Sequence, residues 1–181
     1  IPTTFNINFF DEVARNPGDG GQTERWLQVP QVYINTSPSL VSGIQPTQQE
    51  IDLAEMIIKN DLPRFNNGFT NSNIQIIKGT NPPAFPNPGY IVFRWRDHLV
   101  PNILGAHDES INNNEITGAR ASVKTGLTGS QQLYVNRQEL TQVFGAIYDI
   151  ELGLTPFYPV NSIFDDPQTI DYLDQKDLDL G

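Results

Sequence analysis

The strongest structural pattern in this chain is the stretch Gln138-Glu139-Leu140-Thr141-Gln142-Val143-Phe144-Gly145-Ala146-Ile147-Tyr148. Its apolar residues recur at positions i, i+3, i+4 and i+7, which is the spacing of one helix face; they are Leu140, Val143, Phe144 and Ile147. The stretch therefore predicts a helix that begins near Asn136 and packs this face against a core. Gln138 and Gln142 are four positions apart, so they project together from the helix, with Glu139 beside them.

The same stretch can be set on the pattern H-E-x-x-H-x-x-G-x-x-H, and it matches at Glu139 and Gly145. That pattern is the zinc motif of the metzincin proteases, so the chain resembles the matrixin-like members of that family. In such a motif two imidazoles at i and i+4 hold the metal from one helix face, and the Glu activates the bound water. The glycine lets the chain turn so that a third imidazole completes the site. In this chain Gln138, Gln142 and Tyr148 stand at the three ligand positions.

These substitutions change what the resemblance implies about activity. Catalytic zinc sites use His, Cys, Asp or Glu, and an amide oxygen is a poor ligand beside an imidazole. The resemblance therefore implies a pseudoprotease, not an enzyme, with no zinc or other cofactor. Glu139 and Gly145 would persist as remnants of a degenerate active-site helix.

The residues around the motif extend the resemblance over nearly the whole chain. The helix expected at 47–62 and the strand expected at 115–123 resemble the upper sheet of matrixin-like metzincins, where the strand before the motif lies along the cleft and pairs with extended substrate. Downstream, Asn161-Ser162-Ile163-Phe164 resembles the family's Met-turn, with Phe164 replacing Met. Phe164 follows Tyr148 by sixteen positions, which is longer than the compact matrixin spacing. The ending 174–181 resembles the family's closing helix.

Local patterns supply the remaining elements. Thr47-Gln48-Gln49-Glu50 is a capping box at the start of the helix over 47–62, and Pro63 ends that helix. Alternating or β-rich segments predict strands at 5–9, 26–35, 74–77, 90–95 and 119–123. Two loops are expected, at 80–89 and at 106–114, and a short third helix at 169–180. The expected fold is therefore α/β (α+β): a zincin/metzincin-like mixed twisted sheet with an upstream helix, the degenerate active-site helix and a C-terminal helix.

Length and composition limit the other possibilities. A chain of 181 residues is enough for one domain, which we expect to span 1–181. The net charge of −10 argues against a nucleic-acid partner, because phosphate binding needs a basic face. The charge is uneven, since the stretch from Asp165 to Asp179 carries six Asp and a single Lys.

Other features of the composition suggest where the protein works. The chain has no Cys, so it has no disulfides and no thiolate metal site. It is rich in uncharged polar residues, with 17 Asn and 13 Gln, which favours a secreted, extracellular protein over a charge-rich cytosolic one. No apolar run approaches the roughly 20 residues that a membrane-spanning helix needs.

One further segment contains residues that could bind a cation. His107, Asp108 and Glu109 are consecutive, and His107 is one of only two histidines. A zinc site needs three or four converging ligands, whereas His-Asp-Glu runs in loops are mostly solvated. We therefore expect no metal here, with His107 as the residual candidate. Glu139 is expected to be an ordinary surface glutamate on its helix, because Glu is seldom fully buried unless it is paired.

Three functional hypotheses follow. The first is a catalytically inactive metzincin-like domain with a binding or structural role, whose partner is a protein or peptide, including other copies of itself, held by strand addition. Residues 5–9 are a candidate strand for such pairing, although pairing within the domain is favoured. The second is a metal-dependent peptidase with atypical ligands, using Glu139 with His107 and Asp residues. The third is an ordinary α/β surface protein in which the motif match is coincidental.

Overall fold

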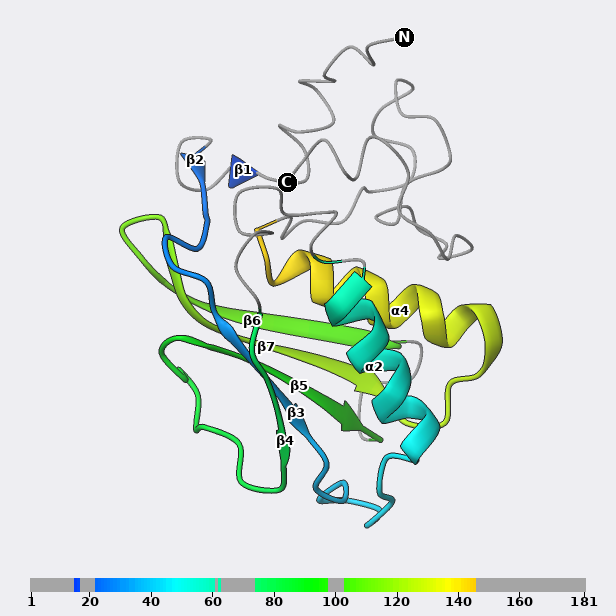
Figure 1. Cartoon of the computed structure of the whole chain (residues 1–181). Helices are drawn as coiled ribbons and strands as arrows, with labels where there is room; N and C mark the ends of the chain where they lie inside the picture. Colours follow the sequence, from blue (N-terminus) through cyan, green and yellow to red (C-terminus); the bar gives the residue numbers. More distant parts are fainter. Residues whose placement is uncertain (1–14, 17–21, 61, 63–73, 98–102, 146–181) are drawn as a thin grey trace, which may run out of the picture.

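The computed structural model describes residues 15–16, 22–60, 62, 74–97 and 103–145 (Figure 1). Strands β1 (Arg15–Asn16) and β2 (Gln22–Thr23) form a small antiparallel pair. The remaining strands are β3 (Gln31–Asn35), β4 (Ile76–Gly79), β5 (Tyr90–Arg96), β6 (Gly105–Asn112) and β7 (Glu115–Lys124). The helices are α2 (Gln48–Asn60) and α4 (Gly129–Gln142). The predicted strand at 5–9 and helix at 169–180 lie outside the described residues.

The five longer strands form one mixed sheet in the order β4-β3-β5-β7-β6. Four of them are parallel, while β6 runs antiparallel to β7 at one end of the sheet. Figure 1 shows α2 and α4 side by side on one face of this sheet. A mixed sheet with a helix upstream and a helix after its last strand confirms the expected α/β class.

Helix α2 begins where its sequence predicts. The amide of Thr47 donates to Oε2 of Glu50 at 2.7 Å, and the amide of Glu50 donates to Oγ1 of Thr47 at 3.2 Å. This reciprocal pair is the capping box, which satisfies amides that the first helical turn leaves free. The apolar face of the helix, including the fully buried Ile57 and Ile58, packs on the sheet.

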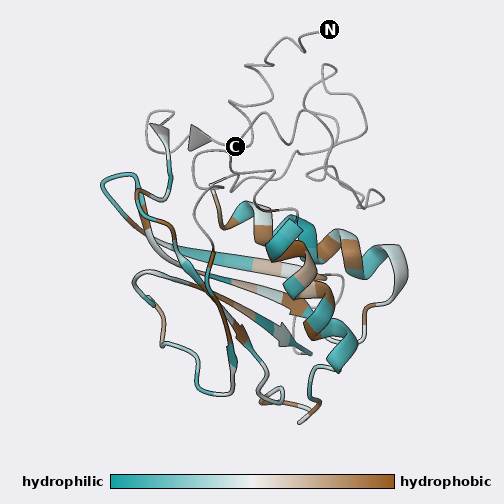
Figure 2. Ribbon diagram, viewed as in Figure 1, coloured by the Kyte–Doolittle hydropathy of each residue, from teal (hydrophilic) through white to brown (hydrophobic). Residues whose placement is uncertain are grey.

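The core lies between the two helices and the sheet. Alternate residues of the parallel strands point into it, because successive side chains of a strand lie on opposite faces; they include Val32, Ile34, Ile91, Phe93, Trp95, Ala119, Ala121 and Val123. Figure 2 shows hydrophobic residues on the helix surfaces that face the sheet. The indole nitrogen of Trp26 donates to the carbonyl of Val143 at 2.8 Å, which ties the chain before β3 to the end of α4.

The prediction of a loop at 106–114 is wrong. Residues 105–112 form β6, which pairs with β7 along its whole length. The two strands are joined by Asn113 and Asn114, which both have positive φ, 50° and 63°. Consecutive Asn residues tolerate the left-handed conformation that a tight two-residue hairpin turn requires. The Asn run is therefore a hairpin turn between two strands.

The hairpin also corrects the expected position of the strand before the motif. That strand, β7, was expected to lie along a cleft, but it lies inside the sheet between β5 and β6. The end position belongs to β6. Two other boundaries differ from expectation: the strand predicted at 26–35 is regular only from Gln31, and helix α4 begins at Gly129, well before Asn136.

Candidate functional site

Helix α4 carries the positions that correspond to the zinc motif. Its last turn leads to Gly145, whose amide donates to the carbonyl of Gln142 at 3.0 Å. Gly145 has a φ of 128°, a backbone conformation that residues other than glycine rarely adopt. A Cβ at this position would lie 3.0 Å from the carbonyl oxygen of Glu24. The glycine is therefore required both by its backbone conformation and by the close approach of another segment.

The first two ligand positions of the motif are buried. Gln138 and Gln142 are each only 1% exposed, although they are polar and one helical turn apart. Each of the two residues takes part in at least one non-covalent interaction. The third position, Tyr148, and the Met-turn-like Phe164 lie outside the described residues. The helix face that would hold a metal in the motif is thus part of the packed interior in this chain.

Glu139 is also buried, at 4% exposed, so its expected place on the surface is wrong. Its Oε2 lies 3.2 Å from Nδ1 of His107, which comes from β6. The two residues are 32 positions apart in the sequence. The structure therefore brings together the two residues that the atypical-peptidase hypothesis named, and His107 is not a solvated loop residue.

Gly105 makes this contact possible. A Cβ at position 105 would lie 2.1 Å from Oε1 of Glu139 and 2.6 Å from its Cγ. Such distances are far inside van der Waals contact, so the carboxylate occupies space that any other residue at the start of β6 would fill. Sequence reasoning did not identify Gly105, because the need for a glycine there arises only when β6 and α4 are packed together.

A second carboxylate flanks His107 on the other side. Oε1 of Glu109 lies 3.8 Å from Nε2 of His107 and, in the part of the chain that the structure describes, has no hydrogen-bond donor within range. Burial raises the pKa of Glu109 to about 7, while His107 acts in the opposite direction. The neighbouring carboxylates Asp108, Glu24 and Glu139 raise it further. The group therefore titrates near neutral pH.

Strand geometry explains which acidic residues join the cluster. His107 and Glu109 are two positions apart in β6, so they share the face that meets α4. Asp108 points to the opposite face, where its Oδ2 accepts from Nε of Arg120 at 2.6 Å. The alternation was present in the sequence, but its meaning depended on recognising the segment as a strand.

The chemical capacity of this cluster is acid–base chemistry. An imidazole between two carboxylates can exchange protons near neutral pH, given the raised pKa of Glu109. In the part of the chain that the structure describes, no group of three or more His, Cys, Asp or Glu converges in a way that could hold a metal ion. The amides of Gln138 and Gln142 do not supply the missing ligands, because they lack an imidazole's affinity for zinc.

A cavity of about 290 Å³ lies elsewhere, beside the N-terminal ends of α2 and α4. Its lining comes from two segments, 44–50 and 125–132, and includes Glu50 and Gln132. Neither His107 nor Glu139 contributes to it. This cavity and the His107–Glu139 contact are therefore separate features.

Comparison with known proteins identifies no relative: no protein-family model, no curated protein and no solved structure matches the chain. Within the described residues, neither helix is long and apolar enough to cross a membrane.

Proposed function

We propose that the chain is a catalytically inactive, metzincin-like extracellular domain with a binding role, in which the former metal-binding face of the active-site helix has become packing surface. The observation that carries this proposal is the burial of Gln138 and Gln142, each at 1% exposed, at the i and i+4 positions of the motif. Neutral amides in a packed interior serve structure, since a catalytic metal site keeps an open position for water or substrate.

Two features of the fold support the resemblance on which the proposal rests. Helix α4 is the element after β7, and Gly145, shortly after the end of α4, has positive φ, as the motif requires. Helix α2 lies between β3 and β4 in the chain and packs on the same face of the mixed sheet as α4. Both features belong to the arrangement that the resemblance implies.

The binding role is assigned to the end of the sheet at β6. Within the described part of the chain, this eight-residue strand has a partner on one side only, β7. A strand at the end of a sheet presents free backbone groups, and an extended polypeptide can add to it by main-chain hydrogen bonds. Figure 2 shows β6 in mostly hydrophilic colours, which fits an exposed edge.

A second candidate is a peptidase that uses atypical groups, and the 3.2 Å contact between His107 and Glu139 favours it. Under this alternative Glu139 would be the general base, and His107 would orient it or ligate a metal. The two functions differ in one measurable respect: the peptidase depends on the charge of Glu139, whereas the inactive domain needs that side chain only for packing.

The test combines metal analysis with restoration of the motif. After dialysis against a weak chelator, we expect the unaltered chain to carry no stoichiometric zinc and to leave casein intact. The triple variant Gln138→His/Gln142→His/Tyr148→His should bind close to one zinc per chain, because it returns all three imidazoles of the zinc motif.

Glu139→Gln and the surface substitution Glu55→Gln form a matched pair of controls. Neither should change casein turnover or zinc content. One zinc per chain in the unaltered protein, or casein hydrolysis that Glu139→Gln abolishes and Glu55→Gln does not, would replace this proposal with the peptidase. A triple variant that folds but binds no zinc would remove the metzincin assignment.

A further inference from the structure

The cavity of about 290 Å³ beside the first turns of α2 and α4 has a buried amide in its lining. Gln132 lines this cavity and is only 9% exposed. Among the described residues, no group forms a hydrogen bond with its side-chain amide. A buried amide without a partner costs free energy, so this one favours a ligand that forms a hydrogen bond with it.

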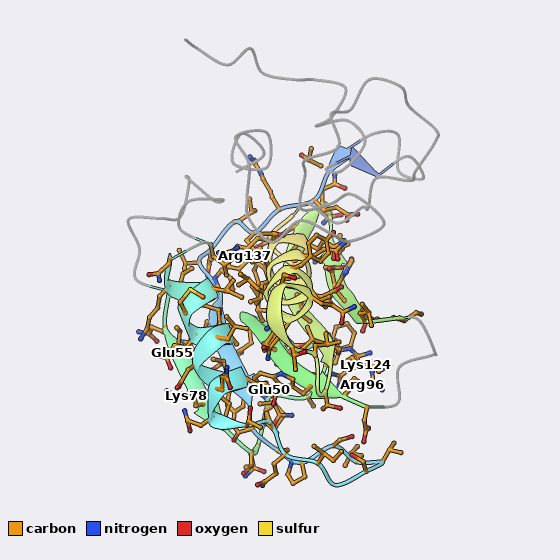
Figure 3. The ribbon with its side chains drawn as sticks, turned by 90° about the vertical axis from the view of Figure 1, so that its right-hand side faces the viewer. Glu50, Glu55, Lys78, Arg96, Lys124 and Arg137 are labelled. Carbon is orange, nitrogen blue, oxygen red and sulfur yellow. The ribbon has the colours of Figure 1, made fainter. Side chains whose placement is uncertain are left out.

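A buried carboxylate lines the same cavity. Glu50 is 8% exposed, and its Oε2 accepts from the amide and the hydroxyl of Thr47, at 2.7 and 3.0 Å. Its Oε1 accepts only a long bond from the amide of Gly126, at 3.4 Å. Figure 3 labels Glu50 beside the first turn of α2.

The charge of Glu50 is not balanced by a cation in the described part of the chain. No Lys, Arg or His of these segments is ion-paired with it. Burying a charge is costly unless an opposite charge accompanies it. The carboxylate therefore favours a ligand that brings a positive charge to its Oε1.

The N-terminal end of α4 favours the opposite charge. Thr128, at the N-cap, makes no side-chain cap bond, and the first turn contains no acidic residue. The first amides of a helix are unpaired within it and carry a partial positive charge, so they attract a carboxylate. Thr128 and Gly129 line the cavity together with Gln132. The cavity thus presents donors from α4 and an acceptor from α2.

We propose that this cavity binds a free α-amino acid with an aliphatic side chain. The carboxylate of such a ligand accepts from the first turn of α4 and from the amide of Gln132, while its ammonium group donates to Oε1 of Glu50. Ile44 and Leu127 also line the cavity and supply aliphatic surface for the ligand's side chain.

The size and position of the cavity agree with this ligand. A volume of about 290 Å³ is at the lower end of the range for small-molecule sites, which suits a ligand of few atoms. None of the lining residues belongs to β6 or to the zinc-motif stretch 138–148. The inference therefore goes beyond the proposed function and does not depend on it.

The lining argues against two other kinds of ligand. None of the lining residues is aromatic, so the cavity offers no ring on which a sugar could stack. A simple anion such as phosphate would be repelled by Glu50, which is the one charged residue in the lining. A zwitterion satisfies both Glu50 and the start of α4.

NMR titration of the isotope-labelled full-length chain with L-leucine tests the inference. Millimolar L-leucine should cause saturable shifts at the backbone amides of Gly126 and Gly129 and at the side-chain amide of Gln132. Isocaproate lacks the ammonium group of leucine, and isoamylamine lacks its carboxylate. Each should bind at least about tenfold more weakly, because a charged hydrogen bond is lost. D-glucose and inorganic phosphate should cause no shifts at these sites.

Matched variants assign the contacts. Glu50→Gln removes the charge but keeps the capping box, in which Gln can replace Glu, and should weaken L-leucine binding at least about tenfold. Glu55→Gln, one turn further along α2, should leave binding unchanged. Gln132→Met removes the amide at nearly constant side-chain length and should weaken binding at least about threefold. The exposed neighbour gives the control Gln131→Met, which should bind as the unaltered chain does.

Three results would overturn the inference. One is the absence of saturable shifts at Gly126, Gly129 and Gln132 with L-leucine. Another is binding of D-glucose or phosphate as tight as that of L-leucine. The third is unchanged L-leucine binding in Glu50→Gln and Gln132→Met, with circular dichroism showing that both variants are folded.

Thr128→Asp gives an independent check. It brings a carboxylate of the chain itself to the start of α4, which stabilises a helix N-terminus and repels the carboxylate of the ligand. The variant should therefore lose L-leucine binding without a fall in melting temperature. Binding that persists in this variant would contradict the assignment of the ligand's carboxylate to α4.

Discussion

Helices α2 and α4 pack on the same face of the same sheet, yet the side chains that they bury differ in polarity. The buried residues of α2 are apolar apart from its capping Glu50; they are Ile51, Ala54, Ile57 and Ile58. Helix α4 buries nine residues. Six of them are neither aliphatic nor aromatic but carry amide, carboxyl or hydroxyl groups; they are Gln132, Asn136, Gln138, Glu139, Thr141 and Gln142. The difference separates an element that serves packing alone from one that retains a polar interior.

The comparison teaches how each helix contributes to stability. Burying apolar surface stabilises a fold in proportion to area, whereas burying a polar group is at best neutral unless it is well hydrogen-bonded. Helix α2 therefore contributes stability, and α4 carries costs that its neighbours must offset. Polar burial of this extent fits a helix that keeps the outline of a site, as the proposed function holds.

The largest expected effect comes from disrupting the apolar packing of α2 on the sheet. Ile57→Ala removes a fully buried side chain between α2 and the sheet, so it should lower the free energy of unfolding by roughly 3–4 kcal/mol through lost burial and a cavity. Urea unfolding followed by circular dichroism measures it. Lys59→Ala, on the exposed side of the same helix, should change stability by less than about 0.5 kcal/mol. Equal effects of the two substitutions would contradict this picture of α2.

The next effect concerns the acidic cluster beneath α4. Glu109 has a pKa of about 7 in the folded protein, against an ordinary value of 4.5. Between these values the folded chain holds a proton that the unfolded chain has released, so stability falls as the pH rises through this range. The loss is at most about 3 kcal/mol, from about 1.4 kcal/mol per pKa unit.

Glu109→Gln should remove most of this loss, because the amide cannot ionise. The measurement is the free energy of unfolding at several pH values between about 4.5 and 8. His107, Glu139, Glu24 and Asp108 remain in the variant, so their contributions are common to both proteins. Parallel pH profiles for the two proteins would show that Glu109 titrates normally.

The smallest expected effect tests the polar residues that α4 buries. Asn136 is fully buried, and among the described residues neither its amide nitrogen nor its amide oxygen has a hydrogen-bond partner. Asn136→Leu keeps the branching at Cγ, with methyl groups somewhat larger than the amide, and should raise the free energy of unfolding by about 1–2 kcal/mol, since an unsatisfied buried amide costs about that much. Thermal and urea unfolding both report it. A clear loss of stability would mean that the amide has a stabilising partner and that α4 is not strained by its polar residues.

The sequence predicted much of the fold because the signals were local. Strand β5 and the core of β7 were expected from their β-rich patterns, and α2 from its capping box and apolar spacing. The start of α4 was missed, because Leu133, Tyr134 and Val135 are consecutive apolar residues whose spacing does not mark one helix face. Strand β6 was missed for a related reason: its sequence is polar, and it becomes a strand by pairing with β7 through the Asn113–Asn114 turn.

The sequence by itself determined the α/β class, the two helices and the absence of disulfides. These properties depend on residue identity and on spacing along a few turns of chain. Only the tertiary structure decided that Glu139 is buried against His107, that Gly105 makes room for it, and that Glu50 and Gln132 line one cavity. Burial and charge environment are set by segments that are distant in the sequence, so no local pattern contains them.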